Sequence, residues 1–176
     1  GTCSRMPKPT ERPRGRFPAM VRSAMLVSVS AWLPYSDTLT PAKTVAELKA
    51  AGITTAVMMV NDFSTARAAT GFKTFDPAKL TAMADACHDA RIPVWLWSWI
   101  MPHAIFVDGA IRQMAALRDA TRAAMIMWDA EAPWTEATGT FDRAASSKRL
   151  ADAFGPANMS VTAIGSAPLE VKPLAA

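Results

Sequence analysis

The chain has 176 residues, of which 51% are hydrophobic, 8% aromatic and 19% charged. This apolar content excludes a wholly disordered chain, and no apolar run approaches the roughly 20 residues that a membrane-spanning helix needs. The formal net charge is +4, and the basic excess lies in residues 1–22. This proline-rich segment is expected to be a disordered leader or a non-native remnant, so nucleic acid is an unlikely partner. Residues 23–168 are expected to form one α/β domain and residues 169–176 a flexible tail.

Strand-like and helix-like patterns alternate along the rest of the chain. Strands are predicted at 25–31, 55–60, 93–100, 123–128 and 159–164. Helices are predicted at 41–50, from Asp76-Pro77 onward, at 111–122 after an Asp108 N-cap, and at 144–154. Successive strands begin roughly 30 to 40 residues apart, which is typical of βαβ units. The fold class is therefore α/β with parallel βα repeats.

About five βα units are predicted, which leaves two architectures open. One is a partial TIM-barrel-like sheet, because a complete barrel usually takes about 250 residues. The other is an open doubly wound sheet. No glycine-rich phosphate loop follows any predicted strand, so no nucleotide cofactor is expected.

The two cysteines, Cys3 and Cys87, form neither a disulfide framework nor a metal-ligand spacing. Cys87 falls in a helical pattern and is expected to be a small buried apolar side chain. The Asp, Glu and His residues show no ligand spacing that demands a metal. No metal or other cofactor is therefore predicted.

Aromatic and acidic side chains gather where the predicted strands end. Ligands of parallel α/β proteins bind at the carboxyl ends of strands. The candidate substrate-binding residues at these ends are Trp32, Tyr35, Asp62, Trp97, Trp99, His103 and Trp134. Indole rings stack on the apolar face of a sugar while carboxylates bind its hydroxyls, so carbohydrate is the ligand that suits this mixture best. Trp95 is expected to pack in the core, and Asn61 and Asp62 could equally cap a turn.

The most specific local pattern is the apolar run that ends in Asp129-Ala-Glu131. In an extended strand, residues two apart point to the same side and lie about 7 Å apart. Two carboxylates beside an apolar wall differ in proton affinity, so one can act as a proton donor while the other is ionised. Glycoside hydrolysis needs such a pair. Glu131 is the predicted general acid and Asp129 its electrostatic partner, whereas a helix cap or surface acids would be the structural alternative.

The order of these features resembles glycoside-hydrolase barrels, especially lysozyme-type family 25 and related peptidoglycan-hydrolase domains. The resemblance covers about residues 25–166 and rests on an initial strand at 27–31, AELKAAGI, TTAVMMVND, IPVWLWSW and Asp129-Ala-Glu131. It implies that the D-x-E glutamate is the catalytic acid and that tryptophans and tyrosines line a groove for polysaccharide. An extracellular or cell-envelope location follows if that reading holds.

Two departures from the family pattern leave alternatives. Ser28 and Ser30 stand where the family usually carries an aspartate, with Asp37 further along the chain. Strands six to eight have no counterpart in the sequence, so a partner chain or a missing C-terminal segment would complete a barrel. The second hypothesis is therefore a noncatalytic carbohydrate-binding or structural module of a larger assembly. A third is another α/β enzyme or small-molecule binder.

Overall fold

The computed structural model describes residues 28–36, 38–62, 71–131, 134 and 141–162. The predicted leader, the predicted tail and both domain boundaries lie outside these residues, as do Cys3 and Asp37.

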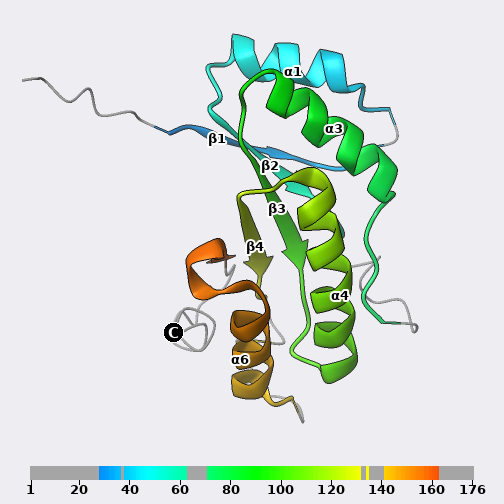
Figure 1. Cartoon of the computed structure of the whole chain (residues 1–176), viewed down its shortest axis with the longest axis vertical. Coiled ribbons are helices and arrows are strands. Elements are labelled where there is room, and N and C mark those ends of the chain that lie inside the picture. The colour runs from blue at the N-terminus through cyan, green and yellow to red at the C-terminus, as the bar shows by residue number, and fades with distance from the viewer. Residues whose placement is uncertain (1–27, 37, 63–70, 132–133, 135–140, 163–176) are drawn as a thin grey trace, which may run out of the picture.

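Five strands form one parallel sheet whose spatial order follows the sequence (Figure 1). They are β1 (Ser30–Leu33), β2 (Thr55–Met59), β3 (Val94–Trp99), β4 (Met125–Asp129) and β5 (Met159–Thr162). Each strand pairs in parallel with the next. The α/β prediction is confirmed. A doubly wound sheet reverses its strand order at a switch point, and the five strands of the described chain show no such reversal. The sheet is partly barrel-like and open.

Four α-helices of the described chain follow the first four strands and cover one face of the sheet (Figure 1). They are α1 (Pro41–Ala50), α3 (Pro77–Asp89), α4 (Ala104–Thr121) and α6 (Arg143–Phe154), and the 3-10 helix η1 (Pro156–Asn158) leads into β5. Neighbouring helices pack against one another in the order α1, α3, α4, α6. This is the layer that right-handed crossovers produce when strands are added in sequence order.

The strands bury different residues on their two faces, as their period of two requires. Met58, Leu96 and Ile126 belong to the large core beneath the helices, together with Leu80 and Met114. On the opposite face, a second cluster consists of Val57, Trp97 and Met127, with Met59 and Trp95 packed against it. We call this opposite surface the inner face, because it corresponds to the interior side of a barrel.

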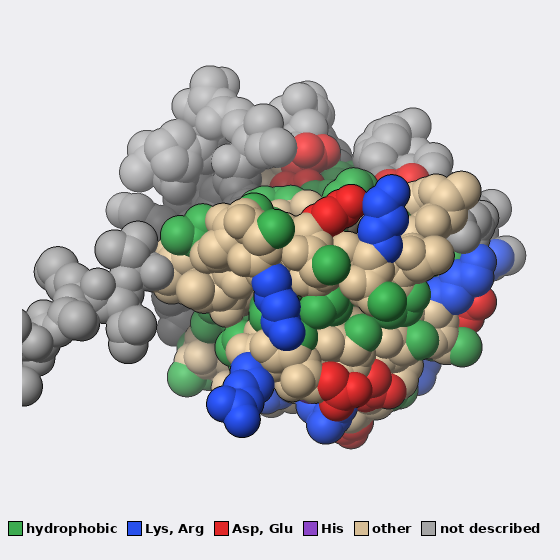
Figure 2. Space-filling view, turned by 90° about the horizontal axis from the view of Figure 1, so that it is seen from above, with side chains coloured by type: hydrophobic (Ala, Val, Ile, Leu, Met, Phe, Trp, Pro, Cys, Tyr) green, Lys and Arg blue, Asp and Glu red, His purple; other side chains and the backbone are tan. Residues whose placement is uncertain are grey.

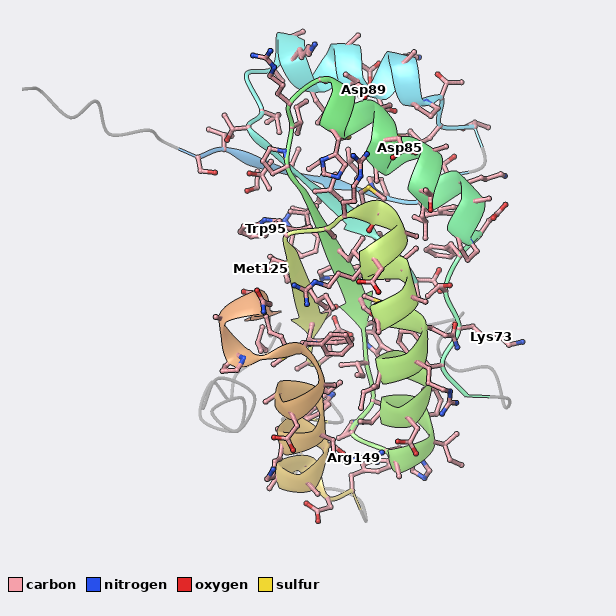
Figure 3. All side chains as sticks on the ribbon, viewed as in Figure 1. Lys73, Asp85, Asp89, Trp95, Met125 and Arg149 are labelled. Atoms are coloured by element: carbon pink, nitrogen blue, oxygen red, sulfur yellow. The ribbon has the colours of Figure 1, made fainter. Side chains whose placement is uncertain are left out.

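Trp95 packs partly buried in the inner-face cluster, so its predicted packing role is borne out on the side of the sheet away from the helices. Trp95 and Met125, labelled in Figure 3, pair across β3 and β4 near the amino ends of those strands. They therefore lie at the opposite end of the sheet from Asp129.

The observed starts of the helices confirm some of the predicted start residues and correct one of them. Pro41 occupies the first turn of α1 as predicted. Helix α3 begins at Asp76-Pro77 as predicted, and the carboxylate of Asp76 caps it by accepting the Ala78 N–H at 2.9 Å. The prediction that Asp108 caps the next helix is wrong: α4 begins at Ala104, and His103 is its N-cap. The earlier start buries Val107 in the helix-side core, and Asp108 forms an ion pair with Arg149 of α6 (Figure 3).

The first strand is also displaced from its prediction. β1 comprises Ser30–Leu33, whereas the sequence pattern placed a strand at 25–31, partly outside the described residues. Pairing with β2 sets the register, since Ser30 aligns with Thr55 and Leu33 with Met58. Trp32 is therefore a residue of the strand rather than of the loop after it.

No helix in the described part of the chain is long and apolar enough to cross a membrane. Figure 2 shows acidic and basic side chains scattered between apolar ones on the face it presents. The described surface in that view therefore offers no broad region of one charge.

Candidate active site at the carboxyl edge of the sheet

The two predicted acidic residues lie at and just beyond the end of β4. Asp129 is the last residue of the strand and is only 2% exposed. Ile126 and Trp128 belong to the helix-side core, whereas Met127 belongs to the inner-face cluster. Alternation therefore directs Asp129 toward the inner face. Glu131 follows two residues later and is half-buried.

A hydrogen bond from β3 orients the Glu131 carboxylate. The indole Nε1–H of Trp99 donates to Glu131 Oε2 at 3.1 Å. Trp99 is also the register partner of Asp129, and Asp129 in turn aligns with Thr162. The structure thus brings Trp99, Asp129 and Glu131 together at one edge of the sheet. A bond between an indole and a carboxylate in a largely buried position is stronger than the same bond in water.

Asn61 holds the backbone of Trp99. Its amide donates to the Trp99 carbonyl at 3.1 Å and its carbonyl accepts the Trp99 N–H at 2.8 Å. The same Asn61 oxygen accepts the Ser98 hydroxyl at 3.2 Å. Asn61 therefore continues the β2–β3 ladder with side-chain atoms, two residues past the end of β2. The sequence pattern identified Asn61 only as a strand-end or turn residue. Its position directly after the predicted strand at 55–60 was the available signal.

Two further tryptophans lie next to each other on the inner face. The rings of Trp32 and Trp97 meet edge to face, with centroids 5.3 Å apart and an interplanar angle of 70°. Trp97 is buried, and Trp32 is 49% exposed. The inner face therefore offers one accessible indole at β1 and one supporting indole at β3.

Tyr35 and Trp134 lie on the helix side instead. The Tyr35 ring stacks on Phe75, with centroids 4.2 Å apart and nearly parallel planes. Trp134 is 1% exposed, and its Nε1–H donates to the carbonyl of Ile100 at 2.7 Å. Both rings pack with the helix-side core, so the structure does not bring them to the inner face beside Asp129.

His103 and Asp62 have other positions. The exposed His103 caps α4 by accepting the Ile105 N–H on Nδ1 at 3.3 Å. Its ring lies nearly perpendicular to the rings of Phe106 and Phe141. Asp62 is half-buried and follows Asn61 directly. Asp62 therefore lies just beyond the end of β2. His103 belongs to the helix layer.

Metal binding finds no support in the described residues. No group of three or more His, Cys, Asp or Glu side chains among them is arranged to hold an ion. Cys87 is buried in the helix-side core, as predicted, and this burial raises the pKa of its thiol. What the site contains is two neighbouring carboxylates, one of them buried, an indole donor and an exposed indole nearby.

Comparison of the sequence with protein-family models and with curated proteins finds no match to either.

Proposed function

We propose that the chain is a glycoside hydrolase-like domain that acts on a polysaccharide, with Glu131 as general acid and Asp129 as its electrostatic partner. The observation that carries this proposal is the hydrogen bond from Trp99 Nε1 to Glu131 Oε2 beside the buried Asp129. It gives the carboxylate a fixed orientation at the edge where parallel α/β enzymes place their chemistry. The resemblance to lysozyme-type hydrolases makes peptidoglycan the first substrate to test, with an extracellular or cell-envelope location.

In the proposed reaction, Glu131 donates its proton to the glycosidic oxygen as the bond from that oxygen to the anomeric carbon breaks. Positive charge develops on the sugar ring in the transition state, and the negative charge of Asp129 stabilises it from the β4 end. Water then adds to the anomeric carbon, and its proton passes to the ionised Glu131 carboxylate. Trp99 keeps Glu131 in place, and the exposed ring of Trp32 offers a stacking surface for sugar.

The test is the variant Glu131→Gln, which preserves shape and removes the titrating proton. General acid catalysis contributes about 10²- to 10⁴-fold, so release of reducing ends from peptidoglycan should fall by at least about 100-fold. The unfolding midpoint should change little, because Glu131 is half-buried and loses no partner. Glu47→Gln on the exposed side of α1 is the matched control and should retain full activity. Undiminished activity of Glu131→Gln would refute the assignment.

A noncatalytic carbohydrate-binding or structural module is the second candidate, and the burial of Asp129 favours it. A carboxylate that is 2% exposed cannot meet a substrate without movement of its surroundings, whereas Trp32 is accessible already. In this case glycan fragments would quench tryptophan fluorescence without being cleaved. Trp32→Ala would abolish the quenching, and Glu131→Gln would leave it intact.

A further inference from the structure

A separate pocket lies between the amino ends of α4 and α6, on the helix side of the sheet. These helices follow β3 and β4, so the pocket lies at the same end of the sheet as Asp129 and Glu131, although neither residue lines it (Figure 1). Its volume is about 230 Å³, and its apolar walls include Pro102, Phe141 and Ala145. A cavity of about 150 Å³ holds benzene. This pocket therefore has room for a six-membered ring that carries substituents.

A buried hydroxyl in this pocket has no partner in the described part of the chain. Ser146 of α6 lines the pocket and is only 6% exposed. Its side chain makes no hydrogen bond to another described residue, whereas the hydroxyl of the neighbouring Ser147 donates to the Arg143 carbonyl at 2.8 Å. Buried polar groups are nearly always hydrogen-bonded. An unsatisfied hydroxyl that lines a pocket therefore indicates a ligand with a polar group at this position.

His103 supplies a second group that can bind such a ligand. Its Nδ1 accepts the Ile105 N–H at 3.3 Å, so this nitrogen carries no proton. The neutral imidazole consequently carries its proton on Nε2. Among the described residues, Nε2 has no hydrogen-bond partner, and the ring lines the pocket. His103 is therefore a neutral donor that is available to a ligand.

The charged groups of this pocket are already balanced. Arg149 forms an ion pair with Asp108 of α4 (Figure 3). Asp142 Oδ1 accepts the Ala145 N–H at 2.8 Å, and the carboxylate lies at the amino end of α6, where the helix dipole stabilises it. Its second oxygen is an acceptor for a ligand. A neutral ligand that both donates and accepts hydrogen bonds therefore suits the pocket better than an ion does.

We propose that this pocket binds a neutral monosaccharide whose hydroxyl groups form hydrogen bonds with Ser146, His103 and Asp142. A sugar hydroxyl both donates and accepts, as this combination of groups requires. The apolar C–H face of the sugar ring packs on Phe141. The site uses neither acidic residue of the proposed hydrolase, so binding of a monosaccharide here neither requires nor establishes cleavage by Glu131.

The test follows the two histidines of the chain by nuclear magnetic resonance during a titration with glucose. The ring resonances of His103 should shift with a dissociation constant of about 1–10 mM. His88 is the internal control, because its Nε2 pairs with the Thr121 carbonyl at 2.8 Å and it does not line the pocket. Unshifted His103 resonances at about 100 mM glucose, or equal shifts of both histidines, would overturn the proposal. Tighter binding of inorganic phosphate than of glucose would also overturn it, since the pocket would then be an anion site.

Two serine variants test the role of the unpartnered hydroxyl. Ser146→Ala should weaken glucose binding about 3- to 10-fold, the usual effect of losing one neutral hydrogen bond. The urea midpoint of unfolding should not fall, because no hydrogen bond to a described residue is lost. Ser147→Ala is the matched control, since this hydroxyl bonds within its own helix, and it should bind glucose as the parent does. Unchanged glucose binding in Ser146→Ala would refute the proposed site.

Discussion

A single buried amide joins the ends of β2 and β3. Asn61 uses its donor and its acceptor on Trp99, whose indole then holds Glu131. A misplaced Trp99 backbone would displace the indole donor as well. The geometry of the candidate site thus depends on a residue that does not touch Glu131.

Replacement of Asn61 by Leu should destabilise the protein substantially. The change removes the two hydrogen bonds that Asn61 makes to the buried backbone of Trp99, and the loss of each costs about 1–3 kcal/mol. Urea denaturation should show a loss of about 2–4 kcal/mol in the free energy of unfolding. Ser98→Ala removes one neutral hydroxyl and is the control, with an expected loss of about 1 kcal/mol. Equal losses in the two variants would show that the Asn61 hydrogen bonds to Trp99 stabilise the protein no more than the Ser98 hydroxyl does.

The Cys87 thiol offers a second residue-scale prediction. Burial raises the pKa of this thiol, so the unfolded state releases the proton first as the pH rises. The resulting stability is fully present below the ordinary thiol pKa of about 8.5 and declines as the pH rises above it. The free energy of unfolding, measured by urea denaturation, should therefore fall less steeply with rising pH in Cys87→Ala than in the parent protein. Parallel pH profiles for the two proteins would contradict this prediction.

At the scale of elements, α4 packs so closely on the chain before α3 that one position admits only glycine. A Cβ at Gly109 would lie 2.8 Å from the Cβ of Phe72, closer than two carbon atoms can approach. Phe72 is buried in the helix-side core, and its carbonyl accepts a hydrogen bond from the Gln113 side chain. The position of α4 is therefore fixed at Gly109 rather than by its caps alone.

Gly109→Ala should destabilise the protein even though alanine favours helix. The gain in helix propensity is about 1 kcal/mol, whereas overpacking in a dense core costs about 1–3 kcal/mol and can exceed it. A net loss of about 1 kcal/mol in the free energy of unfolding is expected. Ala116→Gly, at an exposed position of the same helix, should lose about 1 kcal/mol through propensity alone. A Gly109→Ala protein more stable than the parent would show that the contact relaxes.

At the scale of the molecule, the helix layer covers one face of an open parallel sheet and leaves the inner face lined by aromatic and methionine side chains. Among the described residues of that face, Trp32 at the β1 edge is a large exposed hydrophobic side chain. Exposed apolar groups beside a sheet edge favour binding of other apolar molecules.

Trp32→Ser should therefore reduce binding of the dye 8-anilinonaphthalene-1-sulfonate to the folded protein by at least about half. The free energy of unfolding should fall by about 1 kcal/mol, because the edge-to-face contact with Trp97 is lost. Ile105→Ser on α4 is the control, since Ile105 is exposed but lies in the helix layer. A larger loss of dye binding in Ile105→Ser would locate the apolar surface elsewhere.

The sequence by itself determined the elements whose signals are local. Helix α1 and strand β2 lie almost where the pattern placed them, because Pro41, Gly52 and the apolar run from Thr55 act within a few residues. The same holds for α3 with its Asp76 cap and for β3. The parallel α/β class followed from their alternation.

Only the tertiary structure decided which aromatic rings share a face with Asp129. Tyr35, Trp99 and Trp134 were all predicted at the ends of strands, but Tyr35 and Trp134 pack beneath the helices. The packing of α4 at Gly109 and the role of Asn61 were likewise set by Phe72 and Trp99, which lie more than 30 residues away in the chain. A residue pattern specifies local conformation. The hydrogen-bond partner of a buried polar group is determined only when the fold packs distant segments of the chain against one another.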